Sequence, residues 1–307
     1  LNVSVQLNGY VSDMEPGDVQ QVFNYAYNTS PGMVFRSPDG RYGGANNPED
    51  DVALAANNPL VRLNRISGNI RRNNVRSRFV GTLNPFKGFS ITGSYSYDFS
   101  DRKDKLKPVI IDCWNFRDEV VTYTTANDKT YVENYNISSE RYFNDIVGKY
   151  ENRFSKDRLG FTIMFGASQE KYVENNFKAK KYDLIDMGLG VIDGATGESE
   201  TSGNLSEWVM RSYFSRINLD WQNKYLLELN LRVDNSSRFL PDNRTGYFPS
   251  ASFAWRLDQE NFMKGLVDKG LSNLKLRLSY GSLGTNSVGN YDALSTYKSD
   301  MYTLNNS

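Results

Sequence analysis

Charged side chains alternate with aliphatic ones in the segment "KYLLELNLRVDNSSRF", residues 224–239. Glu228 and Arg232 stand on one side of this alternation, and leucines stand on the other. The leucines are Leu227, Leu229 and Leu231. Because successive side chains of an extended strand point to opposite faces, the pattern predicts a strand with one ionic and one aliphatic face. What the charges do depends on which face borders the core.

A second set of ionisable residues is strongly basic. The segment "NIRRNNVRSRF", residues 69–79, places Arg72, Arg76 and Arg78 on one face of an extended strand. Such a row could attract an anionic solute. It could also form salt bridges with a plug or with neighbouring strands, and this second interpretation is preferred.

The residue types that most enzymes and metal sites use are rare in this chain. The chain has no histidine and one cysteine, Cys113, which excludes Ser-His-Asp triads, internal disulfides and most zinc sites. Glycoside hydrolysis needs two carboxyl groups facing each other across a cleft, and candidates such as Glu119 and Glu133 lie in predicted loops without a supporting pattern. We therefore expect no enzymatic activity, no catalytic residue, no metal-ligand residue and no cofactor, while the sequence leaves open whether the loops bind metal ions.

Composition narrows the partner classes further. Lys+Arg and Asp+Glu both total 36, so no net positive field is available to attract nucleic acid. Mean hydropathy is −0.59, and no run approaches the roughly 20 apolar residues of a membrane-spanning helix. Tyrosine (20) outnumbers phenylalanine (17), which favours surfaces where water meets an apolar phase.

The elements that would position these side chains are strands. Two-residue periodicity recurs with almost no helical pattern, which predicts an all-β protein of about nine strands. The expected strands are 1–13, 71–84, 89–100, 143–153, 158–171, 210–221, 224–234, 247–256 and 274–281. Several runs hold the period for 11 to 13 residues, whereas strands of soluble domains have a mode of roughly 5–6 and bilayer-crossing strands need about 9–11.

Connection lengths alternate along the chain. Short links, "PFKG", "FSKD" and "QN", separate the strands of three expected hairpins, and the connections 14–70, 101–142 and 172–209 are long. Antiparallel strands place alternate connections at opposite ends of a sheet. Tight turns at one end and long loops at the other are typical of outer-membrane barrels, with the turns periplasmic and the loops extracellular.

Aromatic residues mark the tight-turn end, where a girdle at the membrane–water boundary would place them. This expected girdle comprises Phe86, Phe89, Phe154, Trp221 and Tyr225. Cross-strand aromatic pairing in any hairpin is the alternative interpretation. The connection 257–273 has helical spacing of apolar residues between Asp258 and Gly270, which predicts a short periplasmic amphipathic helix. We expect this helix to plug the barrel rim rather than to bind membrane.

Two architectures fit the alternation. In a soluble sandwich the aliphatic face would be the core, whereas in a transmembrane barrel it would meet lipid and the ionic face would line a wet lumen. Strand length and loop asymmetry favour an antiparallel transmembrane β-barrel segment. Its expected lipid-facing residues are Leu227, Leu229, Leu231, Leu276 and Leu278. Its expected lumen-facing residues are Arg72, Arg76, Arg78, Arg216, Glu228, Arg232 and Arg277.

A family resemblance sharpens this interpretation at residues 208–292. The segments "SYFSRINLDWQNKYLLELNLRVDNSSRF", "GYFPSASFAWRL", "ENFM" and "LSNLKLRLSYGSLGTNSVGNY" occur there in this order. In order and spacing they resemble the C-terminal half of the barrel of SusC/RagA-type TonB-dependent transporters of Bacteroidetes. Residues 1–207 fit more loosely, through strand rhythm and "NPLVRLN" (58–64). We expect residues 1–307 to form part of one barrel domain, without the plug domain, the TonB-contacting segment or a signal peptide.

The resemblance implies a location, a function and partners. The location would be the outer membrane, in a barrel of more than twenty strands of which this chain supplies fewer than half. The function would be import of a bulky nutrient, an oligosaccharide or, less often, a peptide. The implied partners are a SusD-like lipoprotein lid, the TonB–ExbB–ExbD complex and outer-membrane lipid.

Solute contact would involve aromatic faces, which stack on sugar rings. The expected loop aromatics are Trp114, Tyr123, Tyr131 and Tyr135, although packing within the loops or against the lid is the preferred interpretation for any single one. A secreted or surface-anchored all-β carbohydrate-binding module remains the alternative. Such a module would have strands of five or six residues and balanced loops.

Overall fold

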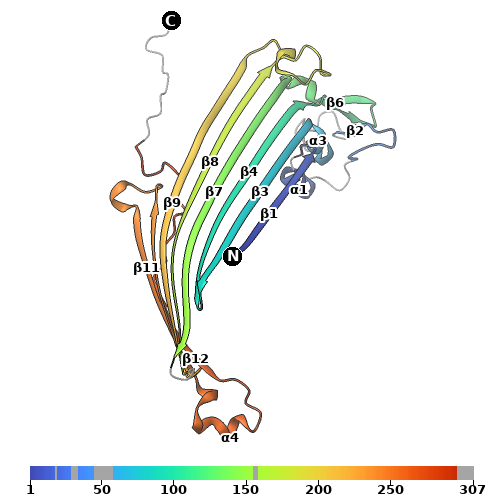
Figure 1. The fold of residues 1–307 in the computed structure, drawn as a ribbon. Coiled ribbons are helices and arrows are strands. Elements are labelled where there is room, and N and C mark those ends of the chain that lie inside the picture. Colours follow the sequence, from blue (N-terminus) through green and yellow to red (C-terminus); the bar gives the residue numbers. More distant parts are fainter. Residues whose placement is uncertain (18, 29–33, 45–57, 155–157, 296–307) are drawn as a thin grey trace.

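The chain folds around one nine-stranded antiparallel sheet. The computed structural model describes residues 1–17, 19–28, 34–44, 58–154 and 158–295. The sheet has the order β1-β3-β4-β7-β8-β9-β10-β11-β12. Its strands are β1 (Asn2–Met14), β3 (Ile66–Phe86), β4 (Phe89–Pro108), β7 (Tyr131–Phe154), β8 (Leu159–Tyr182), β9 (Ser199–Trp221), β10 (Tyr225–Ser236), β11 (Thr245–Arg256) and β12 (Lys275–Gly281). Figure 1 shows them as one curved layer. Within the described residues β1 pairs only with β3 and β12 only with β11, so the sheet is open. The all-β, barrel-segment prediction is confirmed.

The expected asymmetry of connections is present. β3 and β4 are joined through Lys87 and Gly88, and β9 and β10 through residues 222–224. Gln222 and Asn223 both have positive φ (55° and 57°), the pattern of a tight type I′ hairpin turn. The Asp220 carboxylate accepts from the Asn223 backbone N–H at 2.8 Å and holds this turn. The third tight link, "FSKD", lies mostly outside the described residues, because the structure does not describe 155–157.

The strands are longer than their periodicity predicted. The expected strands 143–153 and 158–171 are the turn-side parts of β7 and β8, which have 24 residues each. The predicted connections 101–142 and 172–209 were therefore wrong in extent, since they shrink to 109–130 and 183–198. The physical reason is that the loop-side parts of these strands are mostly polar on both faces, so their few apolar residues form no regular alternation.

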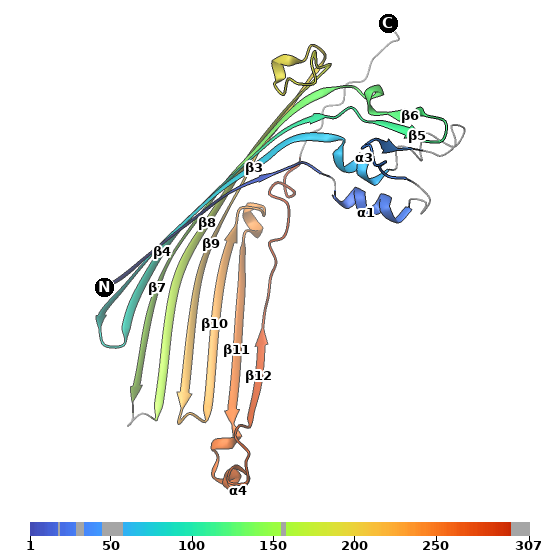
Figure 2. The same cartoon turned by 90° about the vertical axis from the view of Figure 1, so that its right-hand side faces the viewer.

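The loop end carries a small folded unit, which we call the loop subdomain. It comprises helix α3 (Pro59–Asn64) and a three-stranded sheet of β2 (Tyr42–Gly43), β5 (Asp112–Asn115) and β6 (Val120–Thr124). Its core is Val61, Ile111 and Cys113, with Tyr42, Val109 and Tyr123 packed against them. Figure 2 shows this unit and helix α1 (Val19–Asn28) beside the loop ends of β3 and β4.

Buried Asn58 holds the loop subdomain together. Its side-chain amide donates to the carbonyls of Phe35 and Gly43, both at 2.8 Å. Its side-chain oxygen accepts from the Leu60 backbone N–H at 2.9 Å and caps α3. This helix was not predicted, although the segment "NPLVRLN" supplies both its cap and the proline of its first turn.

The remaining short helices lie in the connections. They are η1 (Thr125–Asn127), η2 (Ile192–Gly194), η3 (Pro241–Asn243), η4 (Leu257–Gln259), η5 (Asn261–Met263) and α4 (Lys264–Val267). The amphipathic helix expected within 257–273 is thus two 3-10 turns followed by a single α-turn. Among the described residues, no helix is both long enough and apolar enough to cross a membrane.

Candidate functional site: the two faces of the sheet

Strand register gathers the apolar rows onto one face. Directly opposite residues of antiparallel strands point to the same side of a sheet. Leu227 lies opposite Leu219 and Phe253, and Phe253 lies opposite Leu278. We call the resulting surface the apolar band. Its residues include Val3, Val5, Leu7, Val75, Phe79, Leu83, Ile91, Tyr95, Phe99, Ile146, Phe161, Ile163, Phe165, Ile217, Leu219, Leu227, Leu229, Leu231, Phe253, Leu276 and Leu278.

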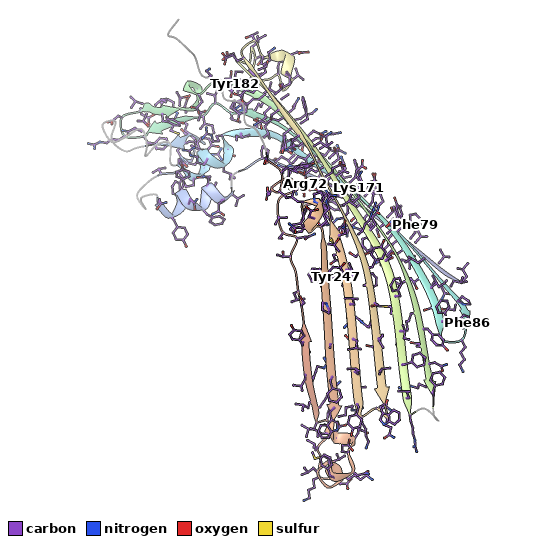
Figure 3. The ribbon with its side chains drawn as sticks, turned by 90° about the vertical axis from the view of Figure 1, so that its left-hand side faces the viewer. Arg72, Phe79, Phe86, Lys171, Tyr182 and Tyr247 are labelled. Carbon is purple, nitrogen blue, oxygen red and sulfur yellow. The ribbon has the colours of Figure 1, made fainter. Side chains whose placement is uncertain are left out.

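No described residue forms a second layer over the apolar band. Leu229 and Leu231 are 40% and 44% exposed, and Leu278 is 65% exposed. The second β-layer of a soluble sandwich would bury these leucines. Figure 3 shows a single layer, with Phe79 and Tyr247 between the tight-turn end, marked by Phe86, and the loop end, marked by Tyr182.

The height of the band matches a bilayer. In β8 it runs from Leu159 to Ala167, after which the same face turns polar at Gln169 and Lys171. Nine residues at about 3.3 Å each span roughly 30 Å along a strand, or about 21–25 Å vertically at a tilt of about 35–45°. The loop-side half of β8 therefore projects beyond the band.

The band also crosses the register obliquely. In β4 its turn-side edge is Phe89, which is level with Tyr150 in β7 and, through Tyr150, with Ile163 in β8. The edge in β8, however, is Leu159, four residues nearer the turn. The edge of the band thus shifts along the strands from β4 to β8. If the band has a constant height, this shift means that the strands are tilted relative to the band, as barrel closure requires.

Polar and charged residues occupy the opposite face. All seven residues of the expected lumen-facing set lie there by register. Arg76 pairs with Asp98 at 2.9 Å, Arg232 pairs with Asp234 at 2.8 Å, and Arg216 donates to Asn230 at 2.7 Å. Salt bridges between and within strands therefore account for two of these charges, Arg76 and Arg232.

A broad hollow lies on this polar face toward the tight turns. Its volume is about 1310 Å³, and Glu228, Asn230 and Arg277 are among its lining residues. Arg153 and Asp220 also line it and pair at 2.9 Å. Figure 3 places Arg72 higher on the sheet, and its buried Nε has no hydrogen-bond partner among the described residues.

The five expected girdle residues lie along the turn-side edge of the band. Phe86 stacks on Phe89 with ring centroids 4.9 Å apart, and Tyr225 stacks on Trp255 at 6.3 Å. Phe154 stacks on Phe161 at 5.2 Å. Four further aromatic residues, which were not predicted, join the row through ring contacts: Tyr150, Phe161, Trp255 and Phe262.

The amino-acid sequence is similar to those of curated TonB-dependent receptors. The chain is 29% identical over 273 residues to the TonB-dependent receptor SusC of Bacteroides thetaiotaomicron, covering 86% of this chain and 24% of that protein. It is 24% identical over 282 residues to the TonB-dependent receptor P3 of Formosa agariphila, covering 91% of this chain and 26% of that protein. No family model matches the chain.

Solved structures show the same fold. The RagAB peptide importer in its closed-closed state superposes with a TM-score of 0.73 at 16% identity, over 94% of this chain and 32% of that one. Its open-open state gives a TM-score of 0.70.

These comparisons confirm the resemblance to SusC/RagA-type TonB-dependent receptors. It spans about a quarter of the length of the curated relatives it matches.

Two of the expected solute-binding aromatics, Trp114 and Tyr123, pack within the loop subdomain. The guanidinium of Arg41 lies over the Trp114 ring, 4.9 Å from its centroid. Arg41 also pairs with Asp39 at 2.6 Å and Glu119 at 2.7 Å, and these bonds raise the pKa of Arg41. Tyr123 packs against the Val61–Ile111–Cys113 core.

The other two, Tyr131 and Tyr135, lie in β7 rather than in a loop, so their predicted loop position was wrong. Register places both on the polar face above the hollow. Lys180 lies 4.0 Å from the Tyr131 ring centroid, and Tyr131 meets Tyr182 edge-on with centroids 6.3 Å apart. Tyr182 was not predicted as a residue of this face, because the expected strand ended at residue 171, whereas β8 continues to Tyr182.

The two carboxylates considered for hydrolysis are not paired with each other. Glu119 binds Arg41 in the loop subdomain, and Glu133 of β7 pairs with Lys178 at 3.2 Å. No group of three or more acidic or thiol side chains is placed to hold a metal ion in the part of the chain that the structure describes.

Proposed function

We propose that this chain forms one side of an outer-membrane barrel domain that imports a bulky nutrient. The observation that carries the proposal is the apolar band, continuous across nine strands and opposite a polar, hollowed face. Hydrocarbon satisfies the first face and an aqueous interior satisfies the second. The likeness to receptors named TonB-dependent supports the same conclusion.

The band sets the position in the membrane. Leu229, Leu231 and Leu278 meet the acyl chains, and the aromatic row at the tight turns lies at the periplasmic headgroups. The loop-side halves of β7 and β8 then stand in the extracellular space and carry Tyr131, Tyr182 and the loop subdomain. A solute arriving from outside would meet these tyrosines on the polar face.

The proposed solute is an oligosaccharide, with a peptide as the second candidate. Tyrosine rings on the polar face offer stacking surfaces for sugars. The peptide candidate draws on the likeness to a structure described as a peptide importer, which at 16% identity concerns fold alone.

Two partners complete the proposed transporter. The TonB–ExbB–ExbD complex would supply energy, as the relatives' names suggest. A SusD-like lipoprotein would cover the loop end, where the loop subdomain offers a folded surface.

Uptake measured in cells tests the proposal. A strain lacking the full-length gene should lose uptake of labelled oligosaccharides, while a peptide pool in the same assay tests the second candidate. Inactivating TonB should abolish the same uptake. Recovery of the full-length protein as a soluble monomer without detergent would refute the membrane placement and favour a surface carbohydrate-binding module.

A further inference from the structure

The connection between β11 and β12 forms a projection at the tight-turn end, which we call the foot (residues 257–270). Its attachment point is Glu260, whose carboxylate accepts three hydrogen bonds. The donors are Tyr225 Oη at 2.7 Å, Trp255 Nε1 at 3.1 Å and Lys224 Nζ at 2.9 Å. Tyr225 and Trp255 belong to the apolar face, so Glu260 fixes the foot to the outer side of the sheet.

Apolar side chains of the foot extend the aromatic row beyond the strands. Phe262 meets Trp255 edge-on, with centroids 6.4 Å apart, yet 67% of Phe262 stays exposed. Leu266 is 53% exposed and Val267 is 37% exposed. Four-residue spacing places Phe262 and Leu266 on the same side of the helical turns.

The end of the foot is also fixed. Gly270 (φ +110°) donates its backbone N–H to the Val267 carbonyl at 3.0 Å, and Leu271 donates to Leu266 at 3.1 Å. A left-handed glycine closing the last turn is a common helix stop. Lys264, Asp268 and Lys269 are exposed around this turn. The foot therefore presents an apolar side and a polar side in a defined orientation.

We infer that the foot is a membrane-surface contact in which Phe262 and Leu266 enter the headgroup–acyl boundary of the phospholipid leaflet at the periplasmic side. Amphipathic segments lie in this zone, and aromatic residues favour it. The inference rests on the proposed membrane placement. It commits to lipid because the apolar side is continuous with the lipid-facing aromatic row. The rim plug expected from the sequence would instead place these residues over the lumen.

Site-directed spin labelling of the full-length transporter in phosphatidylethanolamine–phosphatidylglycerol vesicles tests this inference. Single cysteines are introduced at Leu266→Cys, Asp268→Cys and Leu229→Cys in a Cys113→Ala background, and each carries a nitroxide. Collision rates are measured with oxygen, which concentrates in acyl chains, and with a water-soluble nickel chelate. We expect a several-fold higher oxygen-to-nickel ratio at position 266 than at 268, and a high ratio at 229.

The outcomes separate the two proposals. A position-266 label as accessible to nickel as the position-268 label would place the foot in water and overturn the inference, while a high ratio at 229 preserves the proposed function. A position-266 label shielded from both reagents would mean protein contact and would also overturn it. Water access at 229 would instead refute the membrane placement itself.

Discussion

At the residue scale, Glu260 shows how one carboxylate orders the tight-turn end. Its bonds to Tyr225, Lys224 and Trp255 lower the pKa of Glu260 from 4.5 to about 2. A carboxyl whose pKa is lower in the folded state stabilises that state fully above its unfolded value, and the stabilisation is lost as pH falls through the folded value. The relevant window therefore runs from about pH 4.5 down to about pH 2.

The first prediction concerns this window. Glu260→Gln should lower the thermal unfolding midpoint at pH 7. The substitution removes the negative charge that pairs with Lys224 and can place an amide N–H, a second donor, against the Lys224 ammonium. The difference from wild type should shrink below about pH 4.5 and be small near pH 2. Unfolding in detergent, followed by circular dichroism from pH 7 to 2.5, measures it. A difference independent of pH would contradict the assignment.

The second prediction concerns Asn58 and the thiol it protects. Cys113 is fully buried, and burial raises the pKa of its thiol to about 11. A maleimide should therefore label it slowly at pH 8, through opening of the loop subdomain. Asn58→Ala removes the α3 cap and the side-chain donors to the Phe35 and Gly43 carbonyls. This loss should cost about 1–3 kcal/mol and speed labelling roughly five- to hundredfold.

Asn64→Ala is the matched control for Asn58→Ala. Asn64 is an exposed residue of the same helix whose side chain donates to the Leu60 carbonyl at 2.8 Å. Its variant should label at the wild-type rate. Equal rates in both variants would show that Asn58 does not hold the subdomain closed.

The third prediction concerns Tyr131, the ring proposed to meet solute. Tyr131→Ala should weaken oligosaccharide binding about two- to tenfold, since an aromatic contact contributes about 0.5–1.5 kcal/mol. Tyr213→Ala is the control, because Tyr213 is 55% exposed on the opposite, apolar face. Calorimetry on the detergent-purified transporter compares the two. Equal affinities would remove Tyr131 from the proposed path.

At the element scale, successive residues of β10 point alternately to the apolar face, proposed to meet lipid, and to the polar face, proposed to meet water. The fourth prediction is that Leu229→Arg costs about 2–4 kcal/mol, because a cation at mid-bilayer must leave water. Ser252→Arg, on the polar face opposite Glu228, should change stability little. Urea unfolding from phospholipid vesicles measures both. Equal costs would contradict the assignment of faces.

The strands were predictable from sequence where the bilayer would impose alternation. All nine expected strands exist, because a lipid-facing row needs an apolar residue at every second position. Their loop-side halves were not predictable in this way. The segment 169–182 is mostly polar on both faces, with Val173 and Phe177 as exceptions, and it is paired along its length with β7 and β9.

Contacts across strands were harder to predict than the strands themselves. The turn aromatics Phe86 and Trp221 followed from their position beside short links. Tyr150 and Phe161 join them only through strand register, which the alternation does not specify. The pairing of Arg41 with Trp114 likewise joins segments far apart in the chain.

At the scale of the whole molecule, the central claim is that the apolar band faces lipid. The same stagger that tilts the strands keeps the band at constant height across the sheet. The curved, open sheet of Figures 1 and 2 would then be one side of a wall whose polar surface faces water.

Cysteine scanning along β10 tests this claim most directly. Residues 225–234 are replaced one at a time in a Cys113→Ala background of the full-length protein, and the membrane-inserted variants are treated with a membrane-impermeant maleimide. Labelling should alternate, with Glu228, Asn230 and Arg232 positions reacting and Leu227, Leu229 and Leu231 positions protected. Protection of the leucine positions should disappear when detergent replaces the bilayer. Equal reactivity at odd and even positions, or leucine positions that stay protected without lipid, would contradict the account.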